Sequence, residues 1–257
     1  MVTILYEDKD ILVVQKPAGL ESQSSRGFEP DMVSEIRRYL HNPQDIHSKM
    51  GTKPANQPPY VGVIHRLDKP VSGIMVYARN QESAGALSAA MRAGKMKKMY
   101  LAVVCGKPVD EAGTYVDYLQ QDRKNNRSEI VDKSAGDSRK AALNYKVREV
   151  IHRPDEDGET YSLIDIELLT GRHHQIRVQF AGHGTPLYGD GRYGGNISTM
   201  STLGDINGRT SRRESRPQLA LCAYCLSFPH PVAGRGMEFR MMPSGGAFDW
   251  FAWHPGN

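Results

Sequence analysis

Four ionisable residues stand together in the stretch VIHRLDKPVSGIMVYARN, which covers residues 63–80. They are His65, Arg66, Asp68 and Lys69, and apolar residues flank them on both sides. An aspartate beside two cations stays ionised at neutral pH, because nearby positive charges favour the carboxylate. Such a carboxylate can act as a nucleophile or stabilise a cationic transition state. Asp68 could equally cap the following turn through a side-chain oxygen, so the residues alone leave both roles open.

A second polar group lies in LTGRHHQIRVQFAGHG, over residues 169–184. Its members are Arg172, His173, His174, Gln175 and Arg177. We expect these residues to sit at the start of a helix, where arginines and free backbone N–H groups suit a carboxylate or a phosphate. Adjacent histidines do not share a helical face, which argues against a metal pair. A solvated basic first turn is the alternative.

Other candidate residues carry weaker signals. Tyr100 lies in an apolar run that reads as a strand, where packing is the usual role of a tyrosine. Cys222 and Cys225 form a C-x-x-C pair without a second pair, so we expect them to fill a strand and predict no metal site. The sequence has neither a P-loop nor a GxGxxG motif, and we predict no nucleotide cofactor. Three cysteines, an odd number, favour a reducing compartment, of which the cytoplasm is the simplest.

The apolar periodicities predict an α+β fold around these residues. Helices are expected over 31–40 and 81–93, with Asp31 and Asn80 as N-caps, and up to Gly182 or Gly184. Strands are expected over 4–6, 11–15, 74–78, 97–106, near Tyr115, and over 128–131, 141–150, 161–169, 219–228 and 237–241. Residues 41–60 and 189–217 read as long loops, and 247–256 as a short helix. We predict one domain over 1–257, built on a mixed, mainly antiparallel sheet flanked by helices and loops.

Charge and hydropathy narrow the class of partner. The formal net charge is +4, the isoelectric point is near 8.9 and the mean hydropathy is −0.53. No apolar run approaches the roughly 20 residues that cross a bilayer, so we predict no membrane segment. The basic side chains form three clusters: Lys95, Lys97 and Lys98; Arg123, Lys124 and Arg127; and Arg209, Arg212, Arg213 and Arg216. One cluster alone is typical of a solvated face, whereas three together make a nucleic acid an equal alternative.

Six blocks of the chain, taken in order, resemble the RluA-type family of RNA pseudouridine synthases. The blocks are VVQKPAGL (13–20), HRLDKPVSG (65–73), KKMYLAVVCG (97–106), LTGRHHQIR (169–177), GTPLYGDGRYG (184–194) and LSFPHP (226–231). They span nearly the whole chain. HRLD followed at this distance by TGRxHQIR is the specific part of the resemblance. Two positions depart from the usual pattern: Val71 stands where threonine is common, and Cys222 where many members have histidine.

The resemblance implies roles for particular residues. Asp68 falls on the catalytic aspartate, Tyr100 on the active-site tyrosine and Arg177 on the basic residue paired with the aspartate. Arg66 is placed to take part in flipping the target uridine out of the RNA. The remaining candidate substrate-binding residues are Arg172, His174 and Gln175. The small N-terminal RNA-binding domain of many relatives is expected to be missing, because KPAG comes early in the chain.

The resemblance therefore implies a cofactor-free isomerase that converts uridine to pseudouridine in ribosomal RNA or tRNA. We expect a cytoplasmic monomer. Sequence leaves open whether Asp68 attacks C1′ of the ribose or removes the proton from C2′. The sequence admits three rival functions. They are an inactive RNA-binding protein on the same fold, a hydrolase that uses two carboxylates, and a metal-binding regulator built on His173, His174, Cys222 and Cys225.

Overall fold

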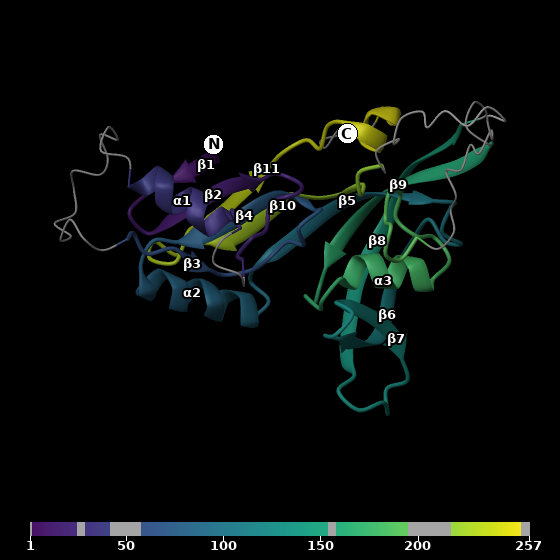
Figure 1. Cartoon of the computed structure of the whole chain (residues 1–257), viewed down its shortest axis with the longest axis horizontal. Helices are drawn as coiled ribbons and strands as arrows, with labels where there is room; N and C mark the ends of the chain where they lie inside the picture. Colours follow the sequence, from purple (N-terminus) through teal and green to yellow (C-terminus); the bar gives the residue numbers. More distant parts are fainter. Residues whose placement is uncertain (1, 25–28, 42–57, 154–157, 195–216, 253–257) are drawn as a thin grey trace, which may run out of the picture.

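The computed structural model describes residues 2–24, 29–41, 58–153, 158–194 and 217–252 (Figure 1). Its strands are β1 (Thr3–Glu7), β2 (Ile11–Lys16), β3 (Gly62–Val63), β4 (Ser72–Ala78), β5 (Lys97–Cys105), β6 (Ala112–Asp122), β7 (Arg127–Val131), β8 (Arg139–Arg153), β9 (Glu159–Leu168), β10 (Leu221–Pro229) and β11 (Gly236–Arg240). They form one continuous sheet in the order β1-β2-β4-β10-β5-β9-β8-β6-β7, with β11 beside β10 and β3 beside β4. Only β10 and β4 pair in parallel among these strands, which confirms the mixed, mainly antiparallel sheet.

Two helices cover opposite faces of the N-terminal half of the sheet. They are α1 (Met32–Leu40) and α2 (Gln81–Arg92). Side chains alternate between the faces of a strand, so Leu12 of β2 packs with Ile36 of α1, whereas Val13 packs in the cluster that contains Leu87 of α2. Both faces of β2 are therefore buried. This explains why its sequence is a continuous apolar run rather than an alternating one.

The helix starts follow from their capping residues. The Asp31 side chain accepts a hydrogen bond of 2.7 Å from the Ser34 amide, and the Ser34 hydroxyl in turn accepts one of 3.0 Å from the Asp31 amide. Asn80 accepts a hydrogen bond of 2.8 Å from the Ser83 amide at the start of α2. Both predicted N-caps are confirmed, because each side chain satisfies an amide that has no partner within the helix.

A third helix, α3 (Gln175–Gly182), covers the other half of the sheet. In Figure 1 it lies beside the strands β6, β7 and β8. Its Phe180 ring meets the rings of Tyr115 and Tyr145 edge-on, at 5.3 and 5.9 Å between centroids. These contacts anchor the middle of α3 in the main hydrophobic core and fix the direction in which its first turn points.

The start of α3 corrects one prediction. Arg172 and His173 precede the helix rather than belonging to its first turn, and His174 is the N-cap residue. The His174 backbone has a φ of 53°, in the left-handed region, and the Gln175 amide donates to the Arg172 carbonyl across a turn. The chain therefore enters the helix through a sharp corner. His173 therefore lies outside the helix that carries Arg177.

Other differences concern lengths and ends. β6 and β8 are longer than expected, and β3 was not predicted, because it contributes only two residues beside β4. The predicted terminal helix is a short 3-10 helix over Gly246–Trp250. Most of each predicted long loop lies outside the described residues: 42–57 of the loop predicted over 41–60, and 195–216 of the loop predicted over 189–217. None of the helices in the described ranges is long and apolar enough to cross a membrane.

Candidate active site

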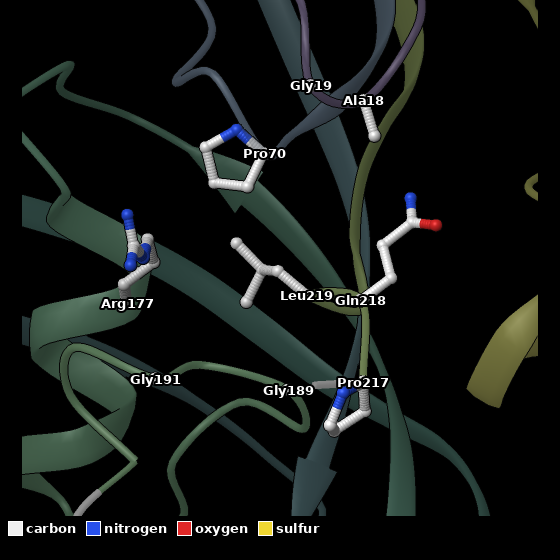
Figure 2. A pocket seen from close by; sticks show the side chains of 9 residues that line it. All are labelled: Ala18, Gly19, Pro70, Arg177, Gly189, Gly191, Pro217, Gln218 and Leu219. Atoms are coloured by element: carbon white, nitrogen blue, oxygen red, sulfur yellow. The ribbon is translucent and has the colours of Figure 1, made fainter. Parts of the chain in front are cut away.

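Several of the six sequence blocks meet at one pocket of about 440 Å³ (Figure 2). Gly19 comes from the chain after β2, Pro70 from the turn before β4 and Arg177 from α3. Gly189 lies in the segment after α3, and Leu219 precedes β10. Residues far apart in the sequence therefore line a single cavity. Of the predicted catalytic residues, Arg177 lines this cavity, and Asp68 lies on the turn that contributes Pro70 to its wall.

Asp68 lies on a turn that neighbouring segments hold in place. The Val71 amide donates to the Asp68 carbonyl at 3.0 Å and closes the turn. The Gly19 amide donates to the Lys69 carbonyl at 2.8 Å, and the Leu67 amide donates to the Ser22 hydroxyl at 2.9 Å. The Asp68 side chain is 30% exposed, so it is held at its backbone while its carboxylate stays accessible. A catalytic carboxylate needs this combination.

Gly73 fixes the exit from the same turn. Its φ is 140°, a conformation that L side chains rarely adopt. A Cβ atom at this position would lie 2.5 Å from the Ala223 carbonyl oxygen of β10. The absence of a side chain therefore lets β4 approach β10 closely enough for the parallel bridges Ser72–Cys222 and Gly73–Ala223. This close approach ties the Asp68 turn to the middle of the sheet.

Lys16, the last residue of β2, binds the backbone of the Asp68 turn through its side chain. Its side chain is fully buried, and its ammonium donates to the carbonyls of Pro17, Lys69 and Val71 at 2.9, 3.1 and 2.7 Å. Burial lowers the pKa of Lys16 to about 8, although the charge of Asp68 opposes that shift. From the sequence, KPAG indicated only a turn. The structure shows that its lysine binds two carbonyls of the turn directly after HRLD, those of Lys69 and Val71.

The lowered pKa of Lys16 predicts how the free energy of unfolding changes with pH. Between about pH 8 and the ordinary lysine value near 10.5, the unfolded chain binds a proton that the folded protein does not. Stability rises with pH wherever the unfolded state binds more protons. We expect the unfolding free energy of the wild type, minus that of Lys16→Met, to increase between pH 7.5 and 10.5. Urea unfolding of both proteins at each pH measures this difference, and a decrease would contradict the prediction.

Arg177 connects Asp68 to a second, fully buried carboxylate. Its Nη1 lies 3.5 Å from Asp68 Oδ2, while its Nε and Nη2 donate to the two oxygens of Asp190 at 2.7 and 2.8 Å. Burial alone would lower the pKa of Arg177, but the hydrogen bonds and charge of Asp190 outweigh it and raise that pKa. Arg177 is therefore a fixed cation, oriented by Asp190 and directed at Asp68.

Asp190 is not available as a second catalytic acid. Its side chain is fully buried, and besides Arg177 it accepts hydrogen bonds from the amides of Arg192 and Tyr193 at 2.9 and 3.1 Å. Burial raises the pKa of a carboxyl group, but the Arg177 hydrogen bonds and charge lower that of Asp190 overall. An ionised, fully bonded carboxylate cannot protonate a leaving group. The hydrolase with two working carboxylates therefore finds no support in this pair.

Tyr100 lies in β5 and is buried in the main core together with Leu67 and Val71 of the Asp68 turn. Burial raises its pKa above the ordinary value, and the negative charge of Asp68 adds to the shift. The tyrosine is thus protonated at neutral pH and electrostatically coupled to the carboxylate. Asp68, Tyr100 and Arg177 come from three separate sequence blocks, and the structure brings them together.

The remaining predicted residues divide by environment. His174 is buried, and its Nε2 lies 3.6 Å from Asp68 Oδ2, whereas Arg66 is exposed. Arg172 donates through Nε to the Lys140 carbonyl at 2.9 Å. The buried Gln175 amide accepts from the Thr170 hydroxyl and the Arg172 amide and donates to the Ala142 carbonyl. Its side-chain oxygen therefore bonds to the segment before α3 and its nitrogen to β8, and its contact with a substrate stays a prediction.

Three residues at the site were missed by sequence reasoning. Lys16 binds the backbone of the turn that carries Asp68. Asp190 binds Arg177, and Tyr193 binds His174; both of these partners face Asp68. A signal was present, because Lys16 lies in the KPAG block and the other two lie in GTPLYGDGRYG. These blocks were recognised as wholes, but no chemistry was assigned to their individual side chains.

The histidines and cysteines do not form a metal site among the described residues. His173 is bonded through both ring nitrogens, to Ser128 and Asn126, and burial raises the pKa of the Cys222 thiol to about 11. Cys222 and Cys225 lie in β10 and fill the strand, as predicted. One cluster of possible ligands, Asp8, Asp10 and His230, lies away from these residues.

That cluster is a set of hydrogen bonds between two segments of the chain. His230 Nδ1 accepts from the Ala233 amide at 2.9 Å, so the ring proton is on Nε2, which donates to Asp8 Oδ2 at 2.8 Å. Asp8 also accepts from the amides of Asp10 and Ile11. All these atoms have protein partners. These hydrogen bonds join the turn before β2 to the chain after β10.

The fold and the site together define an enzyme-like centre with one accessible carboxylate, held against a fixed arginine and a buried tyrosine. The chain belongs to the RNA pseudouridylate synthase family, whose family model matches residues 10–182. This finding confirms the family indicated by the HRLD and TGRHHQIR blocks.

Relatives extend the match over most of the chain. It is 32% identical over 233 residues to the ribosomal large subunit pseudouridine synthase D of Xanthomonas campestris, covering 91% of this chain and 63% of that protein. It is 30% identical over 245 residues to an uncharacterized RNA pseudouridine synthase of Aquifex aeolicus, covering 93% and 69% respectively. The chain thus spans about two thirds of these relatives.

A solved structure confirms the fold. Human RNA pseudouridylate synthase domain containing 1 superimposes with a TM-score of 0.68 at 22% sequence identity, covering 95% of this chain and 84% of that one. A second human protein, RNA pseudouridylate synthase domain containing 4, gives a TM-score of 0.62. At these identities the similarity concerns the arrangement of the sheet and helices.

Proposed function

We propose that this protein isomerises uridine to pseudouridine in structured RNA, with Asp68 as the catalytic carboxylate. The observation that carries the proposal is the position of Asp68 on a held turn, with the Arg177 guanidinium 3.5 Å from Oδ2 at the wall of a pocket. Membership of the pseudouridylate synthase family supplies the reaction class. No specific observation favours the inactive RNA-binding alternative.

The reaction rearranges atoms without gain or loss. The N1–C1′ bond of uridine breaks, the detached uracil turns, and a C5–C1′ bond forms; the proton then leaves C5 and one is gained at N1. The ribose carbon becomes electron-poor when the first bond breaks, so an ionised carboxylate at its face stabilises the transition state. Asp68 does this as the nucleophile at C1′ or as the base at C2′. Neither route uses a redox step, so the proposed mechanism needs no cofactor.

Arg177 and Tyr100 have separate tasks in this mechanism. The guanidinium orients the Asp68 carboxylate, because it is itself fixed by Asp190. Tyr100 remains a phenol at neutral pH, since burial raises its pKa. A phenol is a poor base but a good stacking surface. We therefore assign Tyr100 to contact with the uracil ring rather than to removal of the C5 proton as a phenolate.

The substrate must reach Asp68 as an unstacked nucleotide. A uridine inside a stem has to flip out, which costs a few kcal/mol. Arg66 is exposed two residues from Asp68, where it can hold the backbone or fill the vacated stack. Lys95 and Lys97 are exposed as well and suit phosphate contacts. The arginines between 209 and 216 lie outside the described residues.

The target RNA and the assembly state belong to the same proposal. The Xanthomonas relative is named for the large ribosomal subunit. We therefore place 23S-type ribosomal RNA first among the substrates of this chain and tRNA second. The continuous sheet supports a single catalytic unit over residues 1–257. We propose in addition that this unit is a cytoplasmic monomer.

Mapping pseudouridines in total RNA tests the proposal. Cells lacking this gene are expected to lose one or a few pseudouridine sites, and a plasmid carrying the wild-type gene is expected to restore them. The lost sites identify the RNA. If the pattern of pseudouridines is the same with and without the gene, and the purified protein also leaves uridines in cellular RNA unchanged, the proposed function is wrong.

A further inference from the structure

The residue that faces Asp68 beside Arg177 is His174, whose surroundings determine where its proton lies. Its ring is buried, with Nε2 3.6 Å from Asp68 Oδ2 and Nδ1 2.8 Å from the Tyr193 hydroxyl. Burial and the charge of Arg177 lower the pKa of His174 to about 3. The imidazole is therefore neutral at physiological pH, with its single proton on either Nδ1 or Nε2.

The hydrogen bonds of Tyr193 decide between the two tautomers. The Ser128 amide of β7 donates to the Tyr193 oxygen at 2.8 Å. If the tyrosine donates its own proton to His174 Nδ1, both of its partners are satisfied and the histidine proton lies on Nε2, facing the Asp68 carboxylate. The other tautomer makes the Tyr193 oxygen accept twice. Its own proton then has no acceptor among the residues that the structure describes, and an Nε2 lone pair faces a carboxylate oxygen.

We infer that Tyr193 holds His174 in the tautomer that carries the proton on Nε2, so that His174 donates to Asp68 Oδ2 and positions that carboxylate. The inference rests on the proposed function, because it concerns how Asp68 is kept ready for the ribose. At 3.6 Å the contact is longer than a formed hydrogen bond, and contacts of this kind commonly tighten when the substrate binds.

The two groups that face Asp68 converge on the same oxygen. Arg177 Nη1 and His174 Nε2 both lie nearest to Oδ2, at 3.5 and 3.6 Å. Neither contact is a formed hydrogen bond, and among the described residues no side chain makes one to either Asp68 oxygen. The arrangement therefore directs two protein donors at Oδ2 and leaves Oδ1 for the ribose.

One short turn controls both donors. Asp190 binds Arg177, and three residues later Tyr193 binds His174. Asp190 also accepts from the Tyr193 amide, which ties the two residues together. From the other side, His173 stacks on His174 at 3.7 Å between ring centroids and is held by Ser128 and Asn126 of the β6–β7 hairpin. The His174 ring is thus restrained against flipping, which would exchange its two nitrogens.

Nitrogen NMR of the wild-type protein reads the tautomer directly. In protein labelled with ¹⁵N-histidine at pH 7, long-range couplings from the ring protons distinguish a protonated nitrogen from an unprotonated one. The His174 signals are assigned as those missing in His174→Gln. We expect Nε2 to carry the proton and Nδ1 to be the acceptor. A proton on Nδ1, or a charged ring, would overturn the inference without any need for a catalytic assay.

Kinetics test whether the contact matters. We expect Tyr193→Phe and His174→Leu to slow single-turnover pseudouridine formation about tenfold, with the dissociation constant for RNA unchanged. His174→Gln keeps an amide N–H near the position of Nε2 and should retain most of the rate. Tyr161→Phe is the matched control, because it removes a buried hydroxyl that bonds to Glu159 outside the site.

The outcomes separate the inference from the proposed function. Equal rates for His174→Leu and the wild type would remove His174 from the positioning of Asp68. An equal loss in His174→Gln and His174→Leu would show that shape, not the donor, matters, and would also overturn the inference. If the wild type forms no pseudouridine while its spectrum shows a proton on Nε2, the tautomer assignment stands and the proposed function fails.

Discussion

Replacing Asp68 with asparagine is expected to slow pseudouridine formation by roughly 10⁴-fold or more, the scale on which loss of a central catalytic group acts. Asparagine has nearly the same shape, so the turn that carries it should persist. It lacks the charge that stabilises the electron-poor ribose, and its amide is a poor nucleophile. The rate is measured as release of tritium from C5 of uridine in RNA under single-turnover conditions, with enzyme in excess.

Measurements of stability and of RNA affinity separate a loss of catalysis from misfolding and from weaker binding. The Asp68 side chain is 30% exposed and contacts Arg177 at 3.5 Å, so its neutralisation should leave the unfolding free energy nearly unchanged. RNA affinity should fall little or rise, because a negative charge is removed near a polyanion. Asp110→Asn, at an exposed position between β5 and β6, is the matched control and should keep the wild-type rate. An Asp68→Asn protein with the wild-type rate would eliminate Asp68 as the catalyst.

Asp190→Asn is expected to have the second largest effect, on stability as well as on rate. The change leaves the buried Arg177 guanidinium without its paired charge, and breaking a buried pair costs about 3 kcal/mol of unfolding free energy. Asparagine also presents an N–H group to Arg177, which turns the guanidinium away from its present direction. Asp68 then loses its oriented cation. We expect pseudouridine formation to fall at temperatures where the variant is still fully folded.

Urea unfolding and a matched surface pair test this prediction. Glu238→Gln breaks an ion pair with Arg240 in which both side chains are about half exposed, and it should cost below about 1 kcal/mol. The rate of Asp190→Asn is measured on protein shown to be folded by its near-UV spectrum. If Asp190→Asn is as stable and as active as Glu238→Gln, the buried pair does not organise the site.

The parts of the fold that sequence predicted well are those determined by local chemistry. Asp31 and Asn80 cap their helices because a short polar side chain there satisfies a helix amide, wherever the helix later packs. The apolar run of β2 marks a strand buried on both faces. The start of α3 was misplaced because the left-handed backbone of His174 closes a sharp turn before the helix, which apolar periodicity does not indicate.

The same division explains the candidate site. Asp68 was predicted as a site residue from its charged neighbours, and the catalytic roles of Tyr100 and Arg177 were predicted because their blocks resemble a known family. Lys16 and Asp190 were not, because each acts through a partner elsewhere in the chain: Lys16 binds a carbonyl 55 residues away, and Asp190 binds a guanidinium 13 residues away across a turn. Neither partnership follows from periodicity or spacing. Such residues emerge only when the backbone has placed the segments side by side.

The place of β10 in the sheet has a consequence for the timing of synthesis. This strand lies between β4 and β5, yet it is made long after both, because it begins at Leu221. A nascent chain that ends before β10 has open edges on β4 and β5 and lacks the bridge from Cys222 to Ser72 behind the Asp68 turn. Such long-range pairing forms late. If the protein acts as proposed, we expect a partly translated chain to form no pseudouridine, including in the RNA of the ribosome that is making it.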